Sequence, residues 1–162
     1  MKVFIDELSK ETGYPFKPSK SALVSYLAAV VCHDFFVEIN RVLNTLAVSL
    51  TKIADDIRFL GSEPRCGFGE LLLPANEPGS SIMPGKVNPT QCESITIICE
   101  QVMGNTISVT LGGSRDNFEM NAFKPLIIAN VLHSIRLLAD GINSFTAYCL
   151  LDITANKQQI KK

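Results

Sequence analysis

The sequence carries almost no net charge, and this absence narrows the classes of protein to which it can belong. Lysine and arginine together number 15 against 16 aspartates and glutamates, which leaves a formal charge of −1 over 162 residues. Nucleic acids and anionic membranes are bound by strongly basic surfaces. We therefore expect neither a nucleic acid nor a membrane among the partners of this chain.

Paired cysteines and a leader sequence are also lacking. The five cysteines are scattered, none of them forms a CxxC pair, and their number is odd. The first residues, MKVFIDELSKETG, contain no apolar segment of the kind found in signal peptides. We expect reduced thiols and a cytoplasmic location, or the mitochondrial matrix if the organism is eukaryotic. The longest apolar run, ALVSYLAAVVC at 22–32, is too short to span a bilayer and indicates a buried helix.

Alternating strand patterns and repeats of fixed period are missing, whereas three segments show helical periodicity. We expect helices over about 20–60, 90–111 and 125–150, an irregular stretch up to about residue 89, and frayed residues in the final NKQQIKK. Helices of this length are typical of bundles. The sequence therefore predicts an all-α fold, a long-helix bundle that forms one helical domain over residues 1–162.

The apolar spacing also predicts which residues of the helices face one another. Residues spaced alternately by three and four positions form a seam on one side of a helix. In the first helix they are Leu43, Leu46, Leu50, Ile53, Ile57 and Leu60; in the second Ile95, Ile98, Val102 and Val109; in the third Ile128, Val131, Ile135, Leu138, Ile142, Phe145 and Cys149. Gly61 is expected to end the first helix, Thr90 and Glu93 to cap the second, and Pro125 to lie in the first turn of the third.

A polar loop, GSSIMPGKVNP at 79–89, separates the first two helices. A P-loop is excluded, because five residues instead of four lie between Gly79 and Gly85 and Val87 follows the lysine. A simple linker is the common role of loops rich in glycine and proline. However, the serines, Lys86 and Asn88 supply a cation and several hydrogen-bond donors just before a helix N-terminus, a set suited to holding a small dianion.

The extended motif GSSIMPGKVNPTQCE resembles the signature loop of the fumarase/aspartase superfamily, and Gly85 with the continuation TQCE resembles the class II fumarases (fumarate hydratases) within it. The resemblance continues through SLTKIADDIRFLGSEPRCGFGELLLPANEPGSS before the loop and through QVMGN, FEMNAFKP and SIRLLADG after it, roughly from Asn44 to Asn156. It implies most of the central helical domain of that superfamily. It also implies a lyase that reversibly hydrates fumarate to L-malate in the tricarboxylic acid cycle, with no metal or organic cofactor.

The resemblance further implies roles for individual residues. Ser80 matches the base that takes a proton from carbon 3 of malate, and Glu93 matches the partner of a histidine that activates the water. A serine is a poor base unless surrounding charge and donors activate it. The groups that match the binding site of a substrate carboxylate are Ser81, Lys86, Asn88 and the backbone of Val87.

One expected residue has no counterpart. The catalytic histidine of the family lies upstream of the matching segment, and neither His33 nor His133 corresponds to it. The resemblance therefore predicts a partial chain without the amino-terminal and carboxy-terminal domains of the family, and a homotetramer whose sites are shared between subunits. Two hypotheses remain open: a catalytic piece of a class II fumarase, or a non-catalytic truncated fragment or paralogue that keeps the helical oligomerisation core.

Overall fold

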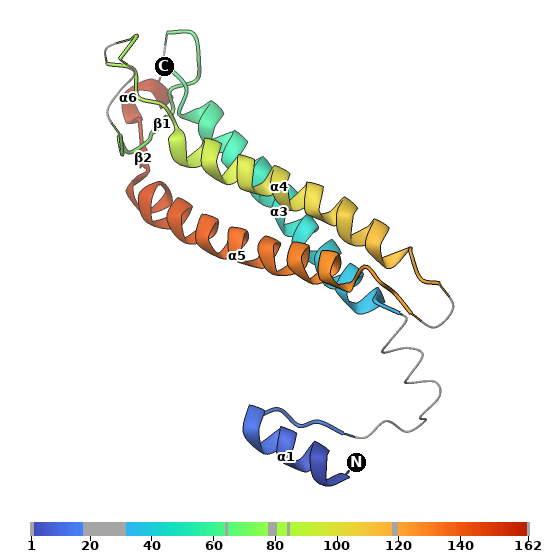
Figure 1. The fold of residues 1–162 in the computed structure, drawn as a ribbon. Helices are drawn as coiled ribbons and strands as arrows, with labels where there is room; N and C mark the ends of the chain where they lie inside the picture. The colour runs from blue at the N-terminus through green and yellow to red at the C-terminus, as the bar shows by residue number, and fades with distance from the viewer. Residues whose placement is uncertain are drawn as a thin grey trace.

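A computed structural model describes residues 2–17, 32–63, 65–77, 81–83, 85–117 and 120–161. Within this part of the chain, three long helices lie side by side in a bundle (Figure 1). They are α3 (Asp34–Leu60), α4 (Thr90–Gly113) and α5 (Lys124–Tyr148). Helix α4 packs extensively against both of the others, and α3 contacts α5 over a smaller area. The all-α, long-helix bundle that the sequence predicts is confirmed.

Smaller elements close one end of the bundle, and the sequence analysis predicts none of them. Strand β1 (Leu71–Leu72) pairs antiparallel with β2 (Thr154–Ala155), and a 3-10 turn η1 (Leu150–Asp152) joins α5 to β2. A short helix α6 (Lys157–Ile160) follows, and the Asn156 side chain accepts a hydrogen bond from the backbone of Gln159 at its start. The prediction that NKQQIKK is frayed is therefore wrong, because Asn156 caps a helical turn there.

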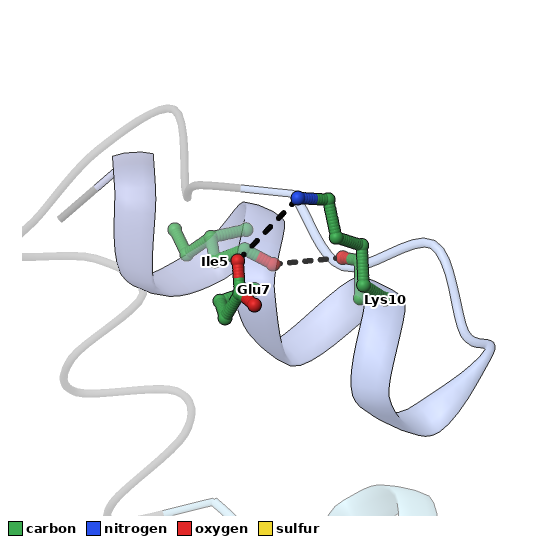
Figure 2. A network of polar contacts seen from close by, with 4 residues as sticks. Ile5, Glu7 and Lys10 are labelled. Carbon is green, nitrogen blue, oxygen red and sulfur yellow. Dashed lines mark hydrogen bonds and ion pairs between the residues drawn. The ribbon is translucent and has the colours of Figure 1, made fainter.

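A further helix, α1 (Lys2–Thr12), lies near the N-terminus, where the sequence analysis predicts no helix. An ion pair between Lys10 Nζ and Glu7 Oε2, 3.5 Å apart, lies on its surface (Figure 2). The predicted helix at 20–60 is confirmed from Asp34 onward, but it is not continuous, because Cys32 and His33 are not helical. Residues 18–31, with most of the predicted buried helix at 22–32, lie outside the described part of the chain.

The helix ends agree with the sequence in two cases out of three. Helix α3 stops before Gly61, and Pro125 lies in the first turn of α5, as expected. The capping box predicted for α4 is wrong. Thr90 is already helical, Pro89 takes the cap position, and no side chain caps this end. The backbone N–H of Glu93 donates to the carbonyl of Pro89 at 3.1 Å, so the helix starts one residue earlier than a threonine cap requires.

Small residues, not the largest apolar ones, form the centre of the α3 seam. Ala47 and Ala54 are fully buried, whereas the predicted seam residues Leu46 and Ile53 remain 41% and 45% exposed. The buried and half-buried set steps by three and four along the helix: Asn40, Leu43, Ala47, Leu50, Ala54 and Ile57. Alternating alanines let α4 approach α3 closely. Four of the six predicted seam residues, Leu43, Leu50, Ile57 and Leu60, are thus half-buried as expected, and Leu46 and Ile53 point to the neighbouring face.

Helix α5 shows the same substitution of small residues for large ones. Ser134 is buried where the sequence analysis places Ile135, which is 42% exposed, and Gly141 is buried next to the predicted Ile142, which is half-buried. Ile127 is buried in place of the predicted Ile128, which is 39% exposed. The predicted seam residues that are buried as expected are Val131, Leu138, Phe145 and Cys149. On α4 the prediction holds, with Ile95, Val102 and Val109 fully buried. Both α3 and α5 therefore carry a second apolar stripe that their own bundle does not cover.

Gly141 lies where α5 packs closely against α4. A Cβ at this position would lie 2.8 Å from Ile98 Cδ1 and 3.0 Å from Ile95 Cδ1. We expect Gly141→Val to lower the free energy of unfolding by about 1–3 kcal/mol, because two further methyl groups must displace both isoleucines. Gly104→Ala is the control. Nothing lies within 4 Å of its added Cβ, so this variant should gain about 0.5–1 kcal/mol from helix propensity. Urea unfolding measures the free energy of unfolding of both variants. Equal changes in the two variants would contradict the prediction.

Burial changes the acidity of the thiols in this core. Burial, and then the neighbouring Cys149, raises the pKa of Cys92 from 9.0 to about 12. The folded chain therefore keeps this proton at a pH where the unfolded chain loses it. The contribution of this thiol to the free energy of unfolding is complete below pH 9 and falls as the pH rises from 9 to 12. Urea unfolding at several alkaline pH values should show a shallower loss of stability in Cys92→Ala than in the unmodified chain. The same loss of stability with pH in the two chains would contradict the role of Cys92.

Helix α5 is also unusually apolar. Together with η1 it forms a stretch, Lys124–Asp152, that is long and apolar enough to cross a membrane by length and composition, and 28% of its most apolar window is buried within the bundle. Arg136 and Asp140 are exposed near the middle of this stretch. Charged side chains at the centre of a bilayer are costly. The exposed face of α5 is therefore better suited to contact with protein than with lipid.

Candidate functional site

The polar loop connects the β1 end of the bundle to the start of α4 (Figure 1). Of the predicted site residues, Ser81, Lys86 and Val87 are exposed there and Asn88 is half-buried. Ser80 lies outside the described part of the chain. The structure therefore shows the carboxylate-binding half of the predicted site as an open surface.

Lys86 follows a tight turn that is closed by the backbone of Lys86 and not by its charged side chain. Its backbone N–H donates to the carbonyl of Met83 at 3.1 Å, and Gly85 between them has φ 84°. Such a φ lies in the left-handed region, where any side chain is strained. Among the described residues no carboxylate pairs with the Lys86 ammonium. Its positive charge is therefore free to meet an anion from solution.

The first turn of α4 adds uncapped donors beside this lysine. The N–H of Thr90 donates to the carbonyl of Asn88 at 2.9 Å, and that of Glu93 to Pro89. Within the described residues, the N–H groups of Gln91 and Cys92 have no acceptor. Free N–H groups and the helix dipole give this end a partial positive charge. A cation and a helix N-terminus thus lie within one short segment.

A cavity of about 180 Å³ adjoins the loop and includes two of its predicted residues, Val87 and Asn88. Its other walls come from the end of α3, from β1 and from the C-terminal segment: Gly61, Ser62, Gly69, Leu71, Leu72, Leu73, Pro89 and Asn156. The Asn156 amide donates to the carbonyl of Gly69 at 2.9 Å, and its backbone N–H donates to Glu70 at 2.8 Å. Sequence reasoning missed both Ser62 and Asn156. The β1–β2 pairing brings Asn156 here, whereas Ser62 follows the end of α3 and accepts a hydrogen bond from the backbone of Phe68 at 2.9 Å.

Glu93 is exposed on the first turn of α4, and neither histidine is its partner. His33 is buried just before α3, with its ring stacked on Phe36 at a centroid distance of 6.3 Å. Helix α3 begins at the end of the bundle opposite to the start of α4 (Figure 1). His133 is exposed on α5, and its Nδ1 lies 3.3 Å from Asn105 Nδ2 of α4. Neither ring takes the role that the family gives to its catalytic histidine.

Comparison with curated proteins gives relatives that align along almost the whole chain. It is 58% identical over 154 residues to the mitochondrial fumarate hydratase of Dictyostelium discoideum, which covers 95% of this chain and 31% of the relative. It is likewise 58% identical over 155 residues to the class II fumarate hydratase of Thermosynechococcus vestitus, with 96% and 32% covered. The chain thus spans about a third of the length of these relatives, and the resemblance is longer than the Asn44–Asn156 range that the motifs predict.

Structural and family comparisons agree with this result. The fold matches the crystal structure of a class II fumarase from Schistosoma mansoni with a TM-score of 0.84 at 44% identity, over 90% of this chain and 30% of that one. A family model described as a lyase matches residues 1–104, which is more than half of the chain. The resemblance to class II fumarate hydratases that the sequence predicts is confirmed, and the chain belongs to the lyase family.

Proposed function

We propose that this chain forms the substrate-loop segment of a fumarate hydratase, which reversibly adds water to fumarate to give L-malate. The observation that carries the proposal is Lys86, with which no carboxylate pairs among the described residues, four positions before Thr90 at the uncapped start of α4. A dicarboxylate needs a concentrated positive potential with hydrogen-bond donors, and this segment supplies both. The relatives at 58% identity are themselves named fumarate hydratases.

In this proposal the loop residues divide the chemistry between binding and proton transfer. Lys86 and Asn88, with Ser81 and the N–H of Val87, hold one substrate carboxylate. As the proton leaves the neighbouring carbon, negative charge builds on that carboxylate, so donors already in place stabilise the transition state more than the ground state. Ser80 takes the proton. Glu93 orients a water-activating histidine that another part of the complete enzyme supplies.

We further propose that the complete protein is a homotetramer with sites shared between subunits. Its support is the second apolar stripe on each of the three long helices. The stripes contain Val42, Leu46 and Ile53 on α3, Ile97, Ile107 and Leu111 on α4, and Leu126, Ile128, Leu132 and Ile135 on α5, all between 39% and 66% exposed. Apolar surface of this extent marks an interface. Helices of other copies would cover it, and a stable monomer in sedimentation would contradict the proposal.

The same reasoning bears on location and domain organisation. A tetramer interface on α5 removes the need for a lipid environment, and we infer a soluble protein of the cytoplasm or mitochondrial matrix. Residues 1–162 would then be part of a central helical domain, flanked in the complete protein by the domains that supply the histidine. A non-catalytic fragment is the second candidate, favoured by the exposure of Ser81, Lys86 and Glu93 on this chain.

A chimaera tests the proposal against this alternative. In it, the 162 residues replace the segment of the Dictyostelium fumarate hydratase to which they align. A functional loop should give kcat for malate within about an order of magnitude of the parent enzyme, because the rest of the parent enzyme supplies the groups that this chain lacks. A folded, tetrameric chimaera without activity would contradict the proposal and favour the non-catalytic fragment.

Gly85 provides a more specific test of the loop in the same chimaera. Gly85→Ala keeps open space around the new Cβ but strains a residue at φ 84°, at a cost of about 1–2 kcal/mol. We expect kcat/KM for malate to fall by about 5–30-fold, since the turn that presents Lys86 is weakened. Gly13→Ala is the matched control, with φ 73° and equally open space but far along the chain from the loop. Equal kcat/KM in the two variants would refute the role of the turn.

A further inference from the structure

Two buried thiols, Cys92 and Cys149, meet where the start of α4 lies beside the end of α5. They are 1% and 3% exposed, and both are free cysteines. Both border one small cavity of about 10 Å³, and the neighbouring Cys149 contributes to the raised pKa of Cys92. The remaining buried cysteine, Cys99, does not border this cavity, and Thr51 of α3 is its neighbour. The core therefore contains one thiol pair and one single thiol in comparable surroundings.

The neighbours of this thiol pair hold the two segments together. The Ser144 hydroxyl donates to the Gln91 amide oxygen at 3.0 Å, which ties α5 to the residue before Cys92. The Asn76 amide donates to the carbonyl of Tyr148 at 2.6 Å, next to Cys149. These bonds fix the backbones on both sides of the pair. The fold therefore keeps both cysteines beside the same cavity.

We propose that Cys92 and Cys149 form a reversible disulfide site, which a small peroxide oxidises without a change of fold. One thiolate attacks the peroxide, forming a sulfenic acid and releasing water. The second thiol attacks that sulfur, the S–S bond forms, and the hydroxyl leaves as water. In sum, two thiols lose two protons and two electrons, and hydrogen peroxide is reduced to two molecules of water. A thiol or dithiol reductant reverses the reaction.

The surroundings decide which oxidants can act. A cavity of about 10 Å³ is near the lower limit for a single water molecule, so a molecule the size of hydrogen peroxide is favoured over bulky disulfides. Burial and then Cys149 raise the pKa of Cys92, with Arg58 of α3 and Glu93 of α4 as the nearby charged groups. The thiolate is thus scarce at neutral pH, and the reaction should be slow at pH 7 and faster at pH 9.

This disulfide would join the end of the polar loop, where α4 begins, covalently to the end of α5. A disulfide here ties the first turn of α4, directly after the polar loop, to the residue that follows α5. It also closes a long segment of chain, which restricts the unfolded state more than the folded one. Oxidation should therefore raise the thermal midpoint of the chain, and reduction should return it.

The test uses the 162-residue chain with its two exposed cysteines replaced, Cys32→Ser and Cys66→Ser, so that only the three buried thiols remain. Hydrogen peroxide is added at pH 7 and at pH 9, free thiols are then alkylated after unfolding, and the digest is analysed without reductant. We expect a linked pair of peptides containing Cys92 and Cys149, two hydrogens lighter than their sum and absent after reduction, with Cys99 still alkylated. Titratable thiols should fall from three to one.

Two outcomes would overturn the proposal. One is the persistence of all three thiols, or their conversion to sulfinic acid, without any linked peptide. The other is a link that involves Cys99 or a second copy of the chain as often as it joins the pair. In Cys149→Ala the peroxide should yield an unlinked sulfenic acid at Cys92, detectable by a dione probe. If that variant does not fold, the peptide analysis of the parent chain decides the question by itself.

Discussion

Replacing Ser80 by alanine in the chimaera is expected to lower kcat for malate by about 10²–10⁴-fold, the usual contribution of a positioned general base. The substitution removes the proposed acceptor of the carbon-bound proton and leaves Lys86 and Asn88 in place to bind the carboxylate. The loss should therefore appear in kcat, with little change in KM. Initial rates of fumarate formation, followed by its ultraviolet absorbance, measure both constants.

Two further variants make this result specific. Ser114→Ala removes an exposed serine at the C-terminal end of α4, where its hydroxyl donates to the carbonyl of Leu111. In this variant kcat should stay within about twofold of the parent, since no contact with substrate is lost. Lys86→Ala should instead raise KM and lower kcat/KM, because it removes charge that binds substrate and transition state alike. If Ser80→Ala turned over malate as fast as Ser114→Ala, the base would have to be another group.

The 162-residue chain by itself is expected to give no turnover above background, even when it folds and associates. Water addition needs a base on one face of the substrate and a second group for the water on the other. Ser80 is available for the first role, but Glu93 has no histidine to orient among the described residues. Losing the second group costs about 10²–10⁴-fold, and losing the groups that position substrate costs more.

A complementation experiment tests the same prediction through a gain of activity. Co-expression of the chain with the Ser80→Ala chimaera should restore part of the activity, because mixed tetramers would contain sites with Ser80 from one chain and the histidine from another. The matched control is the same chain carrying Ser80→Ala, which should restore nothing. Robust activity of the purified chain alone would show that another group of this chain activates the water.

The sequence predicts the three long helices well because their apolar periodicity extends over many turns. It fails in choosing the buried face. Leu46 and Ile135 fit the spacing of three and four as well as Ala47 and Ser134 do, and bulk alone favours the former pair. The close approach that Gly141 allows reverses the choice, since small residues belong where helices nearly touch. Where a helix carries two apolar stripes, periodicity identifies both stripes. It does not indicate which of them packs against the other helices of the bundle.

The candidate site shows a similar division. The loop and its residue types could be recognised from local sequence, because glycine, proline and a lysine before a helix start are local signals. The walls beside it could not. Asn156 reaches the cavity through a strand pair of two residues each, and such short strands carry no readable alternation. Ser62 is held there by a bond from the backbone of Phe68, which no local pattern predicts. Asn156 looked like part of a polar tail, and only its bond to Gly69 shows otherwise.

The β1–β2 pair has a consequence for the order of folding. The long helices contact their neighbours along the chain, whereas Asn156 bonds to a residue 87 positions away. Closing so long a segment is entropically costly until most of the bundle exists. We therefore expect helix docking to precede this pairing, which makes the wall of the cavity beside Asn88 among the last features to form. Ribosome-bound chains that lack the final residues would expose that wall until synthesis passes β2.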